Sequence, residues 1–166
     1  MCRSRNACGG TIGSGERVDP ARLRQALLLL TFIPWCWLMM MVVHEAGHVL
    51  AAWLSGATIE RVVLHPLAFS QTVLGENPQP LLVSWAGALV GSMLPLLAWT
   101  MAAWTNSGVA AFVRFFAGFC LAANGAYLGI GVWSSDGDAG DLVLAGARAW
   151  QLAGFGVLAT ALGCWL

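Results

Sequence analysis

The sequence predicts an all-α polytopic membrane protein with about four transmembrane helices and a short β-like surface segment after the first of them. Two features of composition support this class: 58% of the 166 residues are hydrophobic and only 10% are charged. Soluble domains carry about 25% charged residues. A third feature is the division of the chain into long apolar stretches separated by short polar breaks, which is typical of membrane-spanning segments.

The first apolar stretch covers about residues 26–55. At about 1.5 Å per residue, a helix of that length exceeds the hydrocarbon core of about 30 Å. Pro34 is expected to divide it into a short entry segment and a span over 35–53, and Gly56 is expected to end that span as a C-cap. Three further spans are expected over about 80–104, 109–133 and 142–166.

Residues 57–75 differ from the apolar stretches, because they are rich in β-branched side chains and partly alternate apolar with polar positions. This pattern favours a short strand or hairpin at the membrane surface, and Pro66 makes it an edge or a broken strand. We therefore expect two regions: a flexible cytoplasmic tail over 1–25 and a single membrane-embedded domain over 26–166.

The basic residues indicate the orientation in the membrane. All eight are arginine; five precede the first span, one lies in 57–79 and none lies in 134–141. Because positive charge is retained on the cytoplasmic side, we expect a multi-pass protein of the cell (inner) membrane with a cytoplasmic N-terminus. The formal net charge of zero gives no electrostatic footprint for nucleic acid, so none is expected as a partner.

One polar motif interrupts the first apolar stretch: His44-Glu45-Ala46-Gly47-His48. On insertion scales an acidic residue at the centre of a bilayer costs about 2.5 to 3.5 kcal/mol, so Glu45 within this span indicates a functional role. Residues four apart lie one helical turn apart, and both imidazoles can reach one Zn²⁺ ion. Glu45 would then face water beside the metal and act as a general base.

Zinc needs a third protein ligand, and a catalytic site leaves a fourth position open. The loop over 134–141 contains three aspartates, and the arginine distribution places it on the same side of the membrane as the end of the first span. These aspartates are therefore preferred to the other candidates. The full set of candidates is Glu60, His65, Glu76, Asp136, Asp138 and Asp141.

The motifs together resemble the site-2 protease family of intramembrane zinc metalloproteases, over about residues 35–145. The resemblance rests on the histidine motif inside a span, the β-rich segment after it, the glycine-rich "WAGALVGSMLP" over 85–95, and "NGAYLGIGVWSSDGDAGDLVL" over 124–144. It implies intramembrane proteolysis of a membrane-spanning substrate, with His44 and His48 as zinc ligands and Glu45 as the catalytic base. A regulatory membrane partner would also fit this resemblance.

The resemblance also bears on the third ligand. The run from Asp138 to Val143 matches the family's Asp-Gly-Gly-x-Leu-Leu pattern and favours Asp138, whereas the Asp-Gly dipeptide favours Asp136. Asp141 is the third choice. Asn124 matches an asparagine that the resemblance assigns to the substrate or the oxyanion. However, the usual proline after it is missing and the interval to the aspartate is longer.

Two alternatives remain at this level. The chain could be a non-catalytic membrane zinc protein that acts as a scaffold or a partner-binding module, although such a site has no need of Glu45. It could also belong to another class of zinc peptidase whose third ligand is a glutamate, for which Glu60 or Glu76 is available.

Overall fold

The computed structural model describes residues 19–68, 70–134 and 137–166. It forms two compact units, of which the first ends at Ile33 and the second begins at Pro34. The described part of the first unit is the exposed start of helix α1 (Pro20–Ser55), so residues 20–25 of the expected tail are helical.

The expected division of the first stretch at Pro34 is wrong, because α1 continues through this residue. Proline removes a single N–H from the helical ladder, and its ring crowds the preceding turn. In an apolar stretch the neighbouring backbone groups have no better partners than each other, which favours continuation of the helix.

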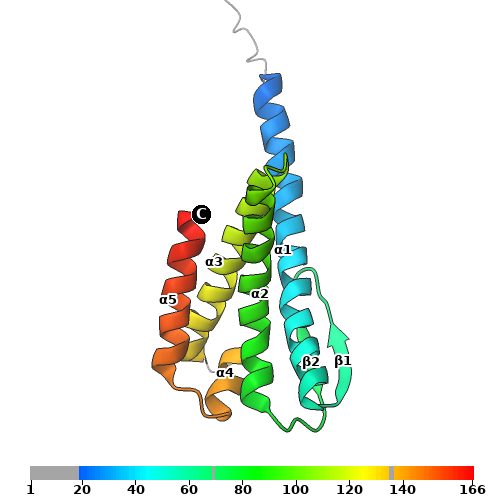
Figure 1. The fold of residues 1–166 in the computed structure, drawn as a ribbon, viewed down its shortest axis with the longest axis vertical. Coiled ribbons are helices and arrows are strands. Elements are labelled where there is room, and N and C mark those ends of the chain that lie inside the picture. Colours follow the sequence, from blue (N-terminus) through cyan, green and yellow to red (C-terminus); the bar gives the residue numbers. More distant parts are fainter. Residues whose placement is uncertain (1–18, 69, 135–136) are drawn as a thin grey trace, which may run out of the picture. The chain divides into compact units, whose positions relative to one another are not determined.

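The second unit contains the rest of α1 and all other elements (Figure 1). These are β1 (Ile59–Val63), β2 (Gln71–Leu74), α2 (Pro80–Trp104), α3 (Ala110–Ser134), α4 (Gly137–Leu144) and α5 (Ala149–Trp165). Among the described residues, α1, α2 and α3 are long and apolar enough to cross a membrane, and α5 is a shorter apolar helix. The predicted class, all-α with a β-like segment after the first span, is confirmed.

The expected fourth span over 142–166 is wrong at its beginning, where the chain forms two helices instead of one. Gly146 has a positive φ of 99°. Around it the N–H of Ala147 donates to the carbonyl of Leu142 (2.8 Å) and that of Gly146 to Val143 (3.0 Å), which is a Schellman motif. The same pair of bonds surrounds Gly56, whose φ is 77°, and confirms it as the C-cap of α1.

The β-like segment is an antiparallel hairpin in which Val63 pairs with Gln71 and Arg61 with Val73. Its connecting loop is tied to α1, because Trp37 Nε1 donates to the carbonyl oxygen of Pro66 (3.2 Å). The hairpin therefore lies beside the part of α1 that carries the histidine motif, and β2 borders the cavity described below.

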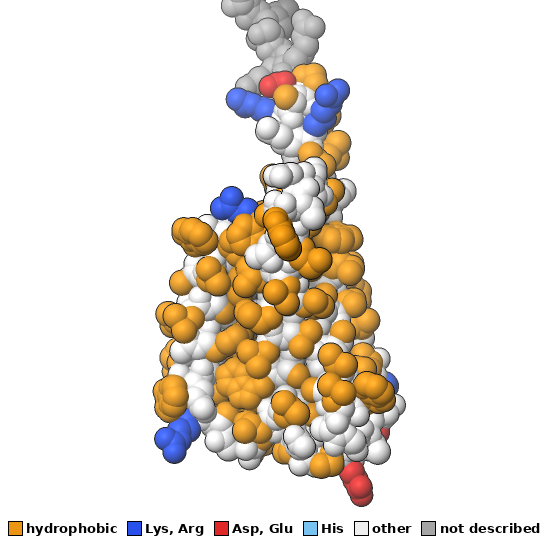
Figure 2. Space-filling view, viewed as in Figure 1, with side chains coloured by type: hydrophobic (Ala, Val, Ile, Leu, Met, Phe, Trp, Pro, Cys, Tyr) orange, Lys and Arg blue, Asp and Glu red, His pale blue; other side chains and the backbone are white. Residues whose placement is uncertain are grey.

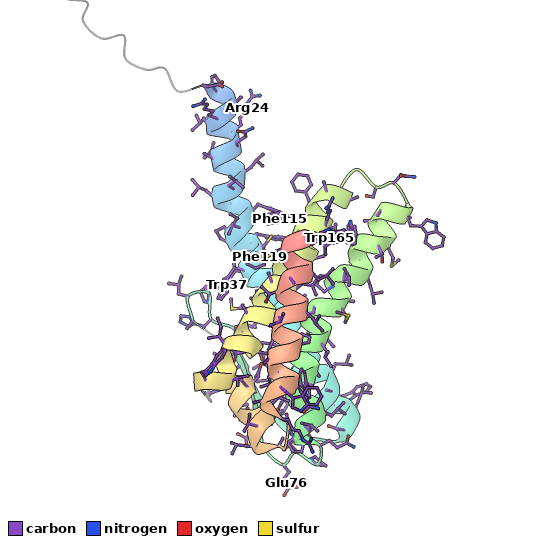
Figure 3. The ribbon with its side chains drawn as sticks, turned by 90° about the vertical axis from the view of Figure 1, so that its left-hand side faces the viewer. Arg24, Trp37, Glu76, Phe115, Phe119 and Trp165 are labelled. Atoms are coloured by element: carbon purple, nitrogen blue, oxygen red, sulfur yellow. The ribbon has the colours of Figure 1, made fainter. Side chains whose placement is uncertain are left out.

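The outer surface of the second unit is apolar. Hydrophobic side chains cover its visible face in Figure 2, whereas charged side chains on that face lie towards its ends. Large side chains such as Leu97, Trp133 and Leu158 are exposed. In Figure 3, Glu76 lies at one end of this unit and Trp165 towards the other. An apolar band between polar ends fits a protein embedded in lipid.

Helices α3 and α5 pack closely through small residues. A Cβ atom added to Gly156 would lie 2.6 Å from Gly129 Cα and 2.9 Å from the Gly125 carbonyl oxygen. Small residues let helix backbones approach in this way, which maximises dispersion contacts where lipid offers no hydrophobic driving force.

This packing predicts a difference between two glycines of α5. Gly156→Ala should lower the melting temperature of the detergent-solubilised protein, because the added methyl group meets backbone atoms of α3. Gly154→Ala is the matched control: no atom lies within 4 Å of its added Cβ, so it should leave the melting temperature unchanged or raise it. Equal melting temperatures for the two variants would contradict the described α3–α5 contact.

Candidate metal centre

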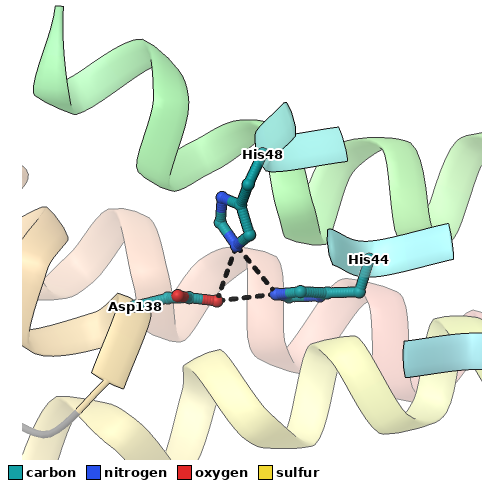
Figure 4. Close-up of side chains that lie close together, drawn as sticks. All are labelled: His44, His48 and Asp138. Carbon is teal, nitrogen blue, oxygen red and sulfur yellow. Dashed lines mark hydrogen bonds and ion pairs between the residues drawn. The ribbon is translucent and has the colours of Figure 1, made fainter. Parts of the chain in front are cut away.

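Helices α1 and α4 bring His44, His48 and Asp138 together, although the aspartate is far from the histidines in sequence (Figure 4). His44 Nε2 lies 2.7 Å from Asp138 Oδ2 and 3.1 Å from His48 Nε2. His48 Nε2 lies 3.3 Å from the same carboxylate oxygen. The three side chains thus point one nitrogen or oxygen atom each towards a common centre.

The other acidic candidates lie outside this cluster. Within the part of the chain that the structure describes, Glu60, His65 and Glu76 are exposed and none of them joins the group of three. Asp136 lies outside the described residues. Asp141 borders the adjoining cavity but does not join the group, and burial together with the Asp138 carboxylate raises the pKa of its carboxyl group.

Asp138 is held as an anion. Burial by itself would raise the pKa of Asp138, but the hydrogen bonds and positive charge of His44 and His48 in their protonated form outweigh this effect and hold its pKa below the usual range. Its backbone N–H donates to Tyr127 Oη (3.3 Å). Gly137, with φ of 58°, lies against the same hydroxyl group, and a Cβ atom there would clash with it.

The outer ring nitrogens of the two histidines face groups that accept hydrogen bonds. His48 Nδ1 lies 2.7 Å from the carbonyl oxygen of Val83 on α2. His44 Nδ1 lies 2.6 Å from Asn124 Oδ1 on α3, whose Nδ2 donates to the carbonyl oxygen of Cys120 (2.8 Å). Neither oxygen carries a hydrogen, so in the neutral imidazoles the proton resides on Nδ1.

This arrangement fits a divalent cation. In the neutral form, with the proton of each ring on Nδ1, both Nε2 atoms present lone pairs to each other and to the Asp138 carboxylate. One extra proton would join only two of the three atoms, whereas a cation between them could bind all three. Tetrahedral zinc with bonds of about 2.0–2.1 Å separates its ligand atoms by about 3.4 Å. The three pairs of atoms lie 2.7, 3.1 and 3.3 Å apart, all inside that separation, so the ligand side chains would move apart to admit the ion.

Helix α2 closes one side of the cluster through its glycines. A Cβ atom at Gly87 would clash with His48 Nε2 and lie 2.7 Å from His44 Nε2, and one at Gly91 would lie 3.0 Å from Asn124 Nδ2. Gly47, inside the histidine motif, lies against the Ala86 carbonyl in the same way. The glycines thus allow α1 and α2 to approach each other and leave room for the imidazoles.

Glu45 is buried beside the cluster and borders the same cavity. Its Oε2 accepts a hydrogen bond from Thr72 Oγ1 on β2 (2.7 Å). One carboxylate oxygen is therefore fixed by the hairpin, while the carboxylate as a whole remains at the cavity. Sequence reasoning identified Glu45 but not Thr72, whose only signal was its place in the β-rich segment.

A cavity of about 930 Å³ adjoins the cluster. Its walls come from α1, β2, the start of α2, α3 and α4, and include Trp37, Thr72, Val83, Tyr127 and Asp141. Asn124 also borders this cavity, but the residue as a whole is 1% exposed and both ends of its amide are engaged within the protein. The cavity is large enough for an extended peptide segment together with water.

One comparison with known proteins found a match. A family model described as Peptidase M50B-like matches residues 24–133. The chain belongs to this peptidase family. The match confirms the resemblance to the site-2 proteases; it covers the whole histidine motif and Asn124, and it ends before α4. Comparisons with curated proteins and with solved structures gave no significant match.

The position of Gly87 in this M50B-like site generates a prediction. Gly87→Ala should greatly reduce the zinc retained by the purified protein, because the methyl group occupies the space of the two Nε2 atoms. Gly154→Ala, with open space around it, should retain as much zinc as the wild type. Metal analysis after purification measures both, and full zinc content in Gly87→Ala would contradict the described packing.

Proposed function

We propose that the chain is an intramembrane zinc metalloprotease that hydrolyses peptide bonds of membrane-associated substrates, with zinc held by His44, His48 and Asp138. One observation carries this proposal: a ligand atom from each of His44, His48 and Asp138 converges on one point in the second unit, while both Nδ1 atoms face hydrogen-bond acceptors outside the cluster. Membership of a peptidase family supports the same reaction class.

Zinc bound there would supply a Lewis acid that acts on water and on the carbonyl of the scissile bond. Glu45 is the group that moves the proton. Thr72 engages Oε2 of its carboxylate, and the carboxylate can take a proton from the attacking water. It later delivers that proton to the leaving amine, so the base is regenerated when the peptide bond has broken.

The substrate proposed is a membrane-spanning segment that enters the cavity in an extended form. The cavity lies among helices that are apolar on their outer faces, and it has carboxylate, hydroxyl and amide groups in its walls. Backbone that is not helical is tolerated at membrane depth only where protein or water surrounds it, and this cavity offers such surroundings. A regulatory membrane partner remains part of the proposal.

Replacement of the base separates catalysis from metal binding. Glu45→Gln keeps the shape of the side chain but cannot accept the proton, so it should retain zinc and lose hydrolysis by about 10² to 10⁴-fold. Asp138→Ala should lose zinc as well as activity, as should His44→Ala and His48→Ala. Zinc content and cleavage of single-span membrane proteins in proteoliposomes measure the two properties.

Asp141→Ala is the matched control, because it removes a carboxylate from the same short helix without touching the cluster; it should retain zinc. Full cleavage activity in Glu45→Gln would eliminate the hydrolase proposal and favour a zinc scaffold. Undiminished zinc content in Asp138→Ala would show that another residue supplies the third ligand.

We also propose that the protein lies in the cell membrane with its N-terminus in the cytoplasm, on the basis of its five N-terminal arginines. A reporter fused to the N-terminus should be active in the cytoplasm, and one inserted after Ser134 should be active only across the membrane. The inverse pattern would reverse the orientation.

A further inference from the structure

We infer that Asn124 is a positioning residue for His44, and that it acts through its side-chain carbonyl on the imidazole rather than by contact with substrate. The inference rests on the proposed zinc site and deepens it. It assigns to this asparagine the role of fixing the tautomer and the ring orientation of one ligand.

The orientation of the Asn124 amide follows from both of its ends. Nδ2 lies 2.8 Å from the Cys120 carbonyl oxygen, to which it can only donate. The reverse assignment would place two oxygens at that distance, which would be repulsive. The amide oxygen therefore faces His44 Nδ1 at 2.6 Å and accepts its hydrogen.

The surroundings of the Asn124 amide prevent it from binding substrate while it is hydrogen-bonded to His44. Asn124 as a whole is 1% exposed, and Gly91 of α2 lies so close that an added Cβ would be 3.0–3.3 Å from the amide atoms. To turn towards the cavity the amide would have to leave both partners. A buried Nδ1–H on His44 without an acceptor is costly, so this movement is opposed.

The two histidines differ in how they are held. His48 donates to the backbone carbonyl of Val83, which no side-chain replacement removes, whereas His44 depends on the side chain of Asn124. An acceptor on Nδ1 directs the Nε2 lone pair to the metal and makes it more basic, and loss of such partners typically lowers metal affinity by about 10- to 100-fold. Position 124 therefore tunes the metal affinity of the site.

The test compares two replacements of similar shape in the full-length protein in detergent. Asn124→Leu removes the acceptor, whereas Asn124→Asp keeps an oxygen towards His44, and its second oxygen, in the neutral carboxyl that burial favours, donates its hydrogen to the Cys120 carbonyl. Zn²⁺ affinity by chelator competition should fall about 10- to 100-fold in Asn124→Leu and stay equal or rise in Asn124→Asp. The visible spectrum of the Co²⁺-substituted protein should be altered in the leucine variant and restored in the aspartate variant.

Ser92→Ala is the control for loss of a buried polar group. Ser92 is fully buried on α2, and its hydroxyl has no hydrogen-bond partner among the described residues, so the variant should bind Zn²⁺ as the wild type does. Wild-type affinity in Asn124→Leu would overturn the inference. Equal weakening of Zn²⁺ binding in both Asn124 variants would also overturn the inference. Asn124→Asp preserves the shape of the side chain, so its Zn²⁺ affinity tests the inference even if the leucine variant fails to fold. A wild-type protein without Zn²⁺ affinity would instead overturn the proposed function together with the inference.

Discussion

The convergence of three lone-pair atoms in an apolar interior is the constraint on which the rest of the second unit depends. Such atoms repel one another, and burying them without a donor or a cation costs several kcal/mol. The Nδ1 hydrogens of the neutral imidazoles cannot relieve this repulsion, because those of His44 and His48 are directed to Asn124 and to the Val83 carbonyl. A cation at the centre would relieve this repulsion for all three atoms at once, which accounts for the polar groups that three helices bring to one point.

Glycine makes this convergence sterically feasible. Gly47 and Gly87 lie where α1 and α2 meet, and each is in contact with atoms that leave no space for a side chain. Gly129 and Gly156 allow the same close approach between α3 and α5. In lipid, helices gain little from hiding apolar surface and associate through close packing. The residues that stabilise the bundle and those that shape the site are therefore partly the same.

Sequence reasoning reached the parts of this structure that depend on local spacing. The one-turn interval of His44 and His48, the apolar stretches and the C-cap at Gly56 all follow from periodicity and backbone preference. The continuation of α1 through Pro34 and the helix break at Gly146 were missed, because a hydrophobic run alone does not show where its hydrogen-bond ladder ends. Thr72 and the Val83 carbonyl could not have been found, since each meets its partner only after distant elements have packed.

The third side chain of the cluster illustrates how much depends on tertiary structure. Asp138 is outside the region matched by the family model, and α3 continues to Ser134 before the separate short helix α4 begins. The carboxylate reaches the histidines because Gly137 adopts a positive φ against Tyr127, whose hydroxyl receives the Asp138 N–H. A metal ion held by His44, His48 and Asp138 would then join α4 to α1. A metal bridging such elements contributes its binding free energy to folding. The short helix that completes the site is also held by its buried residues Ala139 and Leu142, which pack with Ala88 and Leu128, so a bound ion would add to the apolar packing that already positions the carboxylate.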